Sequence, residues 1–399
     1  MQKKRLPKAP AGKTKRLRIY PTDEQKKLLH SWMGIARWTY NKSVMAIKSD
    51  PTLEQSEKRL RGLFVTATAV QKMWEENPED DFAWILAVPT YPRNKAVSEA
   101  VMAFQSNRAK QRKQKKSYKF EVKMRSRLRD PQQCISFDSA DWGRSRGQYT
   151  QMFSRTAMKC CQSLPEQLHY EFKVIYVRVT RKFFLCLSEP IEPVYNLPLD
   201  PLIEPYHVIA LDPGVRTFQT GFDEEGTAIE FGSKSDNRRI YKLCQHLDTL
   251  ESRRCTKSTE NPRKFLRSHR TRNNMKRACA RMREKIRNLV DELHKKLSLW
   301  LCWNYNVVII PEFQTARMAR RSEHRCIGSR TARMMYNWAH YRFRERLIHK
   351  ANEYRNCRIV VVREDYTSKT CGRCGNINKK LGGAEVYKCR AGMRLFSRA

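Results

Sequence analysis

The sequence lacks any hydrophobic run that approaches the roughly 20 apolar residues of a membrane-spanning helix. Its basic start, "MQKKRLPKAPAGKTKRLR", is not followed by the apolar stretch of a secretory signal. The 13 cysteines are an odd number and mostly stand singly, unlike a secreted disulfide framework. These absences argue against an integral membrane protein or a secreted protein, and they favour a reducing compartment.

Acidic residues are scarce relative to basic ones. The chain of 399 residues has 40 Asp and Glu against 80 Lys and Arg, a formal net charge of +40. Because such an excess repels itself, a polyanionic partner is its simplest explanation. Nucleic acid is the first candidate, since neutralising phosphates releases counterions, and an anionic membrane surface is the second. With 40% hydrophobic residues, including 8 Trp, 16 Tyr and 16 Phe, the chain is a folded protein rather than a disordered basic tail.

The basic start predicts an arm followed by a short strand and a helix. Residues 1–18 form either a nucleic-acid-binding tail or a nuclear import signal. Basic and apolar residues alternate in "KRLRIY", which predicts a strand. Thr22 and Gln25 have the spacing of a capping box, so a helix is expected to begin there.

Hydrophobic spacing predicts the remaining elements. Helical patterns cover about 53–75, 94–115, 264–304 and 331–355. Strand patterns occur in "CISFDS", "EFKVIYVRV", "KFFLCLS", "HVIALDPG", "RTFQTGF", "AIEFG", "NVVIIPEF" and "CRIVVVRE". Five prolines at positions 190 to 205 predict an extended linker at 191–205, and hence a domain boundary.

A dense run of Lys and Arg follows the predicted helix at 94–115. The segment "NRAKQRKQKKSYKFEVKMRSRLRD" interleaves Tyr118 and Phe120 with these cations. A solvated charged face is the plain interpretation, but so many like charges beside aromatic rings fit a nucleic-acid groove better. The candidate nucleic-acid-binding residues are Arg108, Lys110, Arg112, Lys113, Lys115, Lys116, Arg125 and Arg127.

Two apolar strand patterns end in an acid: Asp212 in "VIALDPGVRTF" and Glu312 in "VVIIPEF". An acid just past such a strand lies at the carboxyl end of a sheet, where sites form in α/β folds. Paired carboxylates there suit two Mg²⁺ ions, which can activate water and stabilise the leaving oxygen in phosphodiester cleavage. A single Asp before Pro-Gly is also a common turn former, but two such acids in a strongly basic chain favour a nuclease.

Cysteines near the end of the chain predict a zinc site. Cys371 and Cys374 in "TCGRCGN" have the spacing of two zinc ligands, and Cys389 follows at nearly the usual distance for a third. The fourth ligand is expected at about position 392, where the sequence has Gly392. A redox pair is the alternative, although no thioredoxin-like pattern surrounds these cysteines.

The order "LDPGVRTF", "IIPEFQ" and "YTSKTCGRCG" resembles the TnpB (OrfB) family of transposon-encoded RNA-guided nucleases, most closely its eukaryotic and viral branch, Fanzor. The segments "KTKRLRIYPTDEQKKLLHSWMGIARWTYNKSV" and "SYKFEVKMRS" resemble the same family, so the similarity spans nearly the whole chain. It implies an α/β + β fold: an N-terminal wedge β-barrel with a helical insertion, then an RNase H-like (RuvC) domain with a zinc ribbon.

The resemblance implies a division of the chain into functional segments. These are an arm and first strand at 1–20, a helical recognition lobe at 21–115, the rest of the wedge barrel at 116–190, the linker at 191–205, the RuvC-like nuclease domain at 206–365 and an incomplete zinc ribbon at 366–399. The implied partners are a guide RNA and a double-stranded DNA target, with catalytic Mg²⁺ and structural Zn²⁺ as cofactors.

Family positions map onto named residues. Asp212 and Glu312 match the first two RuvC carboxylates, and the zinc ligands match Cys371, Cys374 and Cys389.

The family continues with a fourth cysteine and an Arg-Asp pair whose Asp is the third carboxylate. The present chain reads "KCRAGMRLFSRA", and Ala399 falls about where that Asp belongs. Glu364 or Asp365 is a possible replacement. Without the third carboxylate, the sequence is compatible both with a protein that cleaves DNA and with one that only binds it, because phosphoryl transfer depends on the placement of the metal ions.

Four functions remain compatible with these residues. They are an RNA-guided endonuclease, a guided DNA-binding protein that does not cut, a transposon remnant, and a basic RNA-binding protein unrelated to transposons. A nuclear location is expected in a eukaryotic or viral host, and otherwise the cytoplasm or nucleoid. The residues show no strand-joining chemistry, although the family is often named transposase.

Overall fold

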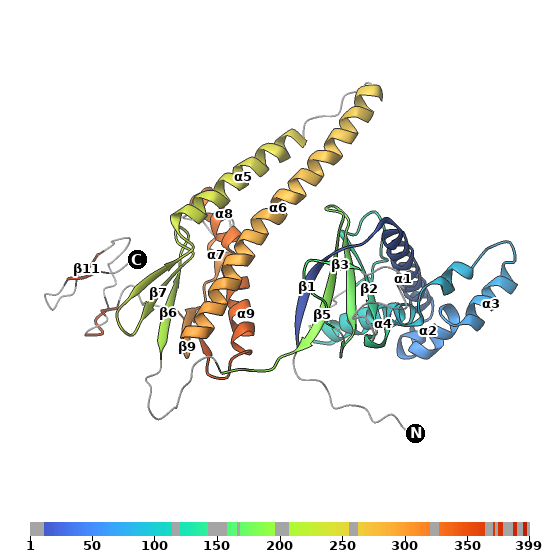
Figure 1. Ribbon diagram of the computed structural model, residues 1–399, viewed down its shortest axis with the longest axis horizontal. Coiled ribbons are helices and arrows are strands. Elements are labelled where there is room, and N and C mark those ends of the chain that lie inside the picture. The colour runs from blue at the N-terminus through green and yellow to red at the C-terminus, as the bar shows by residue number, and fades with distance from the viewer. Residues whose placement is uncertain are drawn as a thin grey trace. The chain divides into compact units, whose positions relative to one another are not determined.

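The computed structural model describes residues 12–113, 120–142, 158–165, 168–195, 207–254, 262–319, 327–363, 370–371, 374–377, 386–388 and 394–396. Contacts divide the chain into two compact units, Met1–Ile191 and Glu192–Ala399. Each unit contains a five-stranded sheet and several helices (Figure 1). The mixed α/β content expected from the sequence is therefore confirmed.

The first unit is built on an antiparallel sheet. Its strands are β1 (Gly12–Tyr20), β2 (Gln132–Phe137), β3 (Lys159–Cys160), β4 (Phe172–Val177) and β5 (Lys182–Pro190), in the order β2-β4-β5-β1-β3. In β5 buried and more exposed residues alternate, as expected for a strand with one face on a core. The predicted strands at the start of the chain and at 134–188 are thus confirmed.

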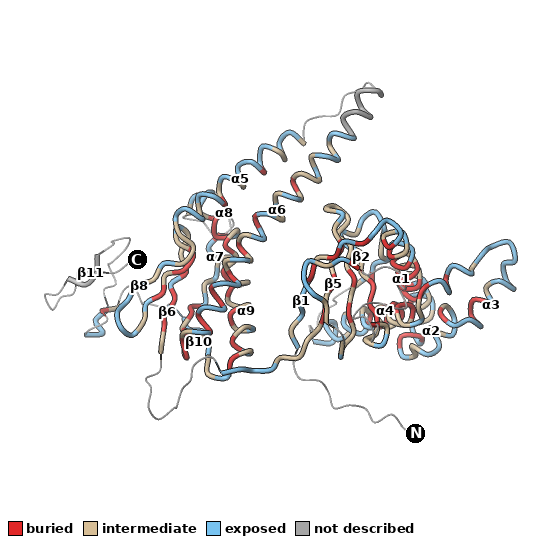
Figure 2. The backbone as a smooth tube through the Cα atoms, in the orientation of Figure 1, coloured by how far each residue is buried: buried red, intermediate tan, exposed pale blue. Residues whose placement is uncertain are grey.

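Helices cover this sheet. They are α1 (Asp23–Ser49), α2 (Glu57–Phe64), α3 (Ala67–Glu76) and α4 (Thr90–Lys113), with 3₁₀ turns η1 (Pro51–Gln55), η2 (Ala83–Ala87) and η3 (Ser139–Asp141). The predicted capping box is present: the Thr22 hydroxyl accepts a bond from the Gln25 N–H at 3.3 Å, and the Gln25 side chain accepts one from the Thr22 N–H at 2.9 Å. Buried residues of α1, α4 and the strands form one core (Figure 2).

The second unit has a mixed sheet. Its strands are β6 (Val208–Pro213), β7 (Gln219–Asp223), β8 (Ala228–Phe231), β9 (Val307–Pro311) and β10 (Arg358–Val362), in the order β10-β9-β6-β7-β8. Strand β9 runs parallel to both β6 and β10, while β6, β7 and β8 form an antiparallel meander. Strands β6, β9 and β10 therefore end at the same edge of the sheet.

Five helices accompany this sheet in the described residues: α5 (Lys234–Arg254), α6 (Pro262–Asn304), α7 (Thr315–Met318), α8 (Ser329–Trp338) and α9 (His340–Ala351). The helix predicted at about 264–304 is confirmed by α6, which buries Ile286, Val290 and Leu297 in a core with Ile209 and Val308. Helix α5, which packs along α6, was not predicted.

The prediction of one continuous helix at 331–355 is wrong. Ala339 has φ 50° and ψ 52°, a left-handed conformation that ends α8 and lets α9 begin in a new direction.

Near the end of the chain, β11 (Val386–Lys388) and β12 (Arg394–Phe396) form an antiparallel pair. Among the residues the structure describes, no helix is both long enough and apolar enough to cross a bilayer.

Candidate functional site

The two predicted acids lie at one edge of the second sheet. Asp212 is the second-to-last residue of β6, and Glu312 directly follows β9. The parallel register pairs Ala210 with Ile309, so Asp212 and Glu312 come two and three residues after the last paired positions of neighbouring strands. Adjacent strands lie about 5 Å apart. The structure thus brings both acids to the carboxyl edge where the sequence placed them.

Asp212 occupies the solvent-facing side of β6. Ile209 and Leu211 are buried in the core, whereas Asp212 points away from it and is exposed. Neighbouring protein atoms nevertheless remove part of the hydration of its carboxylate, and this desolvation raises the pKa of Asp212. Within the described ranges no cation forms an ion pair with Asp212. A carboxylate in this state gains from a nearby positive charge, such as a metal ion.

Glu312 is held by the backbone of the neighbouring strand. Its N–H donates to the carbonyl of Val362 at 2.8 Å, which extends the pairing of β9 and β10 by one residue. Its side chain is exposed.

The turn after Asp212 is anchored to two helices. Gly214 donates its N–H to the Phe218 carbonyl at 3.2 Å, and a Cβ at Gly214 would lie 2.5 Å from the carbonyl oxygen of Thr217. The carbonyl of Val215 accepts hydrogen bonds from the Trp338 indole, at 3.0 Å, and from the Asn237 amide. Helices α5 and α8 thereby fix the loop that follows Asp212.

An aromatic cluster contacts the loops that follow the two acids. The Phe218 ring stacks against His294 and His340, each at 5.0 Å between ring centroids. Phe313, the residue after Glu312, contacts His340 edge-on at 4.9 Å. His340 therefore links the loop after Asp212 to the loop after Glu312.

Both histidines in this cluster are neutral at neutral pH. Burial lowers the pKa of His294 to about 3 and that of His340 to about 4. His294 contacts the carbonyl of Trp338 at 2.9 Å, and His340 contacts the Gln219 amide at 3.3 Å. This cluster was not predicted from the sequence, because a single histidine within a helix or at its start carries no distinguishing pattern.

The cysteine pair lies in a tight turn. The N–H of Cys371 donates to the Asn376 carbonyl at 2.8 Å, and the N–H of Gly375 donates to the Cys371 carbonyl at 2.9 Å. Cys371 is buried and Cys374 is exposed. Such a turn suits two zinc thiolates.

Several predicted positions lie outside the described residues: Cys389, Gly392, Glu364, Asp365, Ala399, Lys115 and Lys116. Within the described part of the chain, no three side chains of His, Cys, Asp or Glu gather as metal ligands.

The predicted nucleic-acid-binding residues fall into two groups. Arg108 pairs with the nearly buried Glu54 at 2.5 Å, and Arg125 pairs with Glu99 at 2.7 Å while its guanidinium lies over the Tyr40 ring. These arginines hold the first unit together.

The other described candidates, Lys110, Arg112, Lys113 and Arg127, are exposed at the end of α4 or in the loop before β2. They are therefore accessible to a polyanion.

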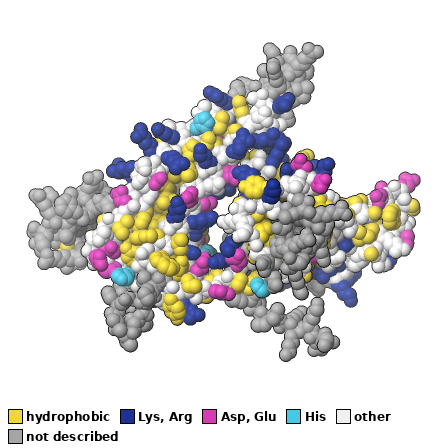
Figure 3. Space-filling view, in the orientation of Figure 1, with side chains coloured by type: hydrophobic (Ala, Val, Ile, Leu, Met, Phe, Trp, Pro, Cys, Tyr) yellow, Lys and Arg dark blue, Asp and Glu magenta, His cyan; other side chains and the backbone are white. Residues whose placement is uncertain are grey.

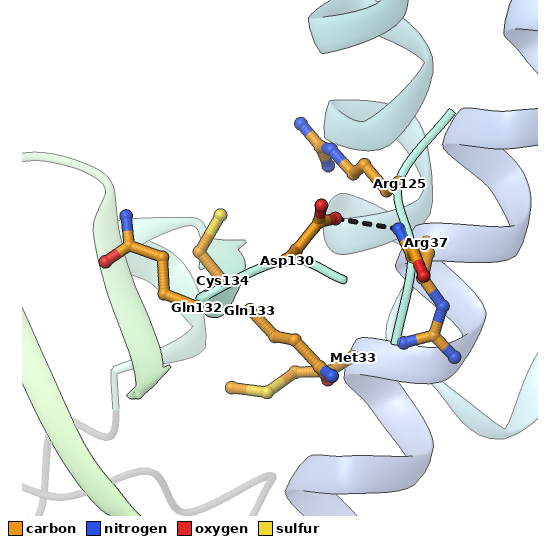
Figure 4. Close-up of a pocket in the computed structure, with 8 residues that line it drawn as sticks. Met33, Arg37, Arg125, Asp130, Gln132, Gln133 and Cys134 are labelled. Atoms are coloured by element: carbon orange, nitrogen blue, oxygen red, sulfur yellow. Dashed lines mark hydrogen bonds between the residues drawn. The ribbon is translucent and has the colours of Figure 1, made fainter. Parts of the chain in front are cut away.

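A small cavity beside that loop is too small for a nucleotide. Its volume is about 80 Å³, and Figure 4 shows Asp130 among its lining residues, with Arg37 and Arg125 nearby. The carboxylate of Asp130 accepts a hydrogen bond from the Ser126 N–H at 2.7 Å. This volume accommodates water molecules only.

Two family models match the chain. A helix-turn-helix domain of the OrfB type matches residues 12–49, which form β1 and the single helix α1. A Cas12f1-like TNB domain matches residues 340–395, which begin at α9 and include the cysteine pair.

Viral relatives extend this similarity to nearly the whole chain. A transposase-like protein of Paramecium bursaria Chlorella virus 1 is 24% identical over 95% of this chain and 83% of its own. A TnpB-like protein of Acanthamoeba polyphaga mimivirus is 23% identical over 95% of this chain and 69% of its own. Over nearly its whole length, the chain is therefore similar to TnpB-like and transposase-like proteins of viruses. The predicted resemblance, including its viral branch, is thus confirmed.

One shorter sequence match and two structural matches complete the comparisons. The CRISPR-associated endodeoxyribonuclease Cas12f1 of Sulfoacidibacillus thermotolerans is 31% identical to this protein over 28% of this chain and 25% of its own length. Among solved structures, a Cas12f1–sgRNA–target DNA complex gives a TM-score of 0.44 at 13% identity, covering 96% of this chain and 97% of the other. CasPhi-2 (Cas12j) bound to crRNA gives 0.42 at 9% identity, covering 98% and 96%.

Proposed function

We propose that this protein is an RNA-guided, metal-dependent DNA endonuclease of the TnpB type. The observation that carries the proposal is the position of Asp212 and Glu312 at the carboxyl ends of neighbouring parallel strands. A RuvC-like nuclease domain at residues 206–365 requires this arrangement.

The two carboxylates fit Mg²⁺ through the chemistry of their donors. Mg²⁺ prefers carboxylate oxygens, and Asp212 has an exposed, partly desolvated carboxylate without an ion-pair partner among the described residues. Bound metal ions supply activation of water and stabilisation of the leaving oxygen in phosphodiester cleavage. In the sequence, Glu364 and Asp365 follow closely after β10, so one of them is our candidate for a third carboxylate.

The remaining assignments support a guided mechanism. Base pairing with a guide RNA reads the DNA sequence, while the protein supplies charge and shape, and a net charge of +40 suits two nucleic-acid partners. We assign residues 21–115 to a recognition lobe, 116–190 with the first strand to a wedge barrel, and 366–399 to a zinc ribbon that uses Cys371, Cys374 and Cys389. In a eukaryotic or viral host, the arm at 1–18 would direct the protein to the nucleus.

A cleavage assay with the protein and its transposon-derived guide RNA tests the proposal. Asp212→Asn and Glu312→Gln should each lower Mg²⁺-dependent cleavage of a matched DNA duplex by about a hundredfold or more, while guide binding is retained. The matched control is Glu230→Gln, an exposed acid on β8 of the same sheet, which should cut at the wild-type rate. Full cleavage by Asp212→Asn would refute the assignment. Guide-dependent binding of the matched DNA without cleavage by the wild type would identify a guided DNA-binding protein instead.

A further inference from the structure

A basic cavity lies beside the candidate site in the second unit. Its volume is about 420 Å³, within the range of small-ligand pockets. Four of its eight lining residues are cations, namely Arg216, Lys234, Arg238 and Arg330, and none is acidic. Four positive charges around one cavity without a balancing carboxylate favour an anionic ligand.

The four cations are exposed, and none forms an ion pair with an acidic side chain within the described residues. The guanidinium of Arg330 lies over the Tyr241 ring, 4.2 Å from its centroid, which holds the cation in place without neutralising it. Figure 3 shows further Lys and Arg side chains gathered over α5 and α6 on the face in view.

Two helices begin at this cavity and add to its positive potential. Lys234 is the first residue of α5, and Arg330 is the second residue of α8. The N-cap of α8, Gly328, provides no side-chain cap. The helix dipole places partial positive charge at the start of each helix, and this charge attracts anions.

The wall of the cavity is continuous with the loop after Asp212. Val215 and Arg216 line the cavity and follow Asp212 by three and four residues. The Val215 carbonyl accepts hydrogen bonds from both Asn237 and Trp338, and these bonds hold the cavity in a fixed position relative to Asp212.

We propose that this cavity binds a backbone phosphate of the DNA strand that is cut, close to the scissile bond. The proposal rests on the proposed nuclease function. A phosphodiester matches the site because it is anionic, bears several acceptor oxygens and is well recognised by arginine. The DNA strand is favoured over the guide RNA because only the strand being cleaved must pass Asp212.

A binding experiment tests the cavity without requiring cleavage. In the full-length Asp212→Asn protein with guide RNA bound, Arg216→Glu combined with Arg330→Glu should weaken the binding of a short single-stranded DNA about tenfold or more. The slope of log affinity against log salt should fall by about one. The matched control carries the same change of charge at two exposed lysines of α6, Lys285→Glu with Lys295→Glu, and should weaken binding clearly less.

The outcomes separate the cavity from the nuclease function. Equal losses of DNA affinity in the cavity variant and in its control would overturn the assignment of the cavity as a phosphate site. Weakened binding of the guide RNA with unchanged binding of DNA would also overturn it, by identifying an RNA site. If the wild type does not cut but the cavity variant loses DNA binding selectively, the cavity stands as a DNA phosphate site and the nuclease function fails.

A cleavage experiment then locates the phosphate. In the wild type, a neutral methylphosphonate introduced at single positions near the cut should slow cleavage most at one position. The Arg216→Glu, Arg330→Glu variant should lose that sensitivity, because the contact is already absent. Undiminished sensitivity in the variant would contradict the assignment.

Discussion

His340 contacts the loop after Asp212 and the loop after Glu312, and its protonation should lower the stability of the folded state. Burial lowers its pKa from 6.5 to about 4, so between these values the unfolded chain binds a proton that the folded chain does not. Stability therefore falls as the pH decreases through this window, by at most about 1.4 kcal/mol per pH unit for each such histidine. Unfolding by urea at pH 7.5 and at pH 5 should show this loss, to which His294 also contributes.

A substitution separates the contribution of His340 to this pH-dependent loss of stability from that of His294. His340→Phe keeps a ring against Phe218 but cannot be protonated, so the difference in stability between the two pH values should shrink by about 2 kcal/mol. His349→Phe, at an exposed position of α9, should leave the difference unchanged. An unaltered difference in the His340 variant would show that His340 is not held neutral by burial.

The positions of single residues were predictable where the local sequence determines them. Asp212 and Glu312 could be placed because each follows an apolar strand, and the carboxyl end of a strand is a definite location. Arg108 was predicted as a nucleic-acid contact from charge density alone, yet it pairs with Glu54, which is 54 residues away. Local sequence does not encode such distant pairings.

Elements with strong local signals were predicted, and others were not. Helix α1 has a capping box and α6 has a long apolar stripe, and both were expected. Helix α5 was missed because its sequence is strongly polar and buries mainly Ile240, Cys244 and Leu247. The break at Ala339 depends on tertiary contacts, since Trp338 and His340 on either side bond to Val215 and Gln219.

The junction between β8 and α5 should be intolerant of any side chain at Gly232. This residue has φ +71°, and a Cβ there would lie 2.7 Å from the Cβ of Phe218 and 2.9 Å from Leu293. Gly232→Ala should destabilise the protein by about 2–4 kcal/mol, from backbone strain together with overpacking. Gly226→Ala provides the control, because its φ is +83° but nothing lies within 4 Å, and it should cost only about 1–2 kcal/mol. Equal losses in urea unfolding would show that crowding against Phe218 is unimportant.

On the scale of the whole molecule, the charge of +40 indicated the class of partner but not which cations bind it. The structure separates arginines engaged in ion pairs from exposed cations, and these two groups should respond differently to substitution. Lys110, Arg112 and Lys113 are exposed at the end of α4, whereas Arg108 one turn earlier neutralises a Glu54 side chain that is only 8% exposed.

Replacing Lys110, Arg112 and Lys113 together by Gln should lower the slope of log affinity for double-stranded DNA or guide RNA against log salt by about two to three, with little change in stability. Arg108→Gln should do the reverse: it leaves Glu54 without its partner and costs about 1 kcal/mol of folding stability, because the arginine itself is half exposed. Its salt slope should equal the wild-type value, because a cation that contacts no phosphate releases no counterions. A triple variant that keeps the wild-type slope would place the polyanion elsewhere on this basic surface. A fall of about one in the slope with Arg108→Gln would show that the ion pair opens on binding and that Arg108 contacts phosphate directly.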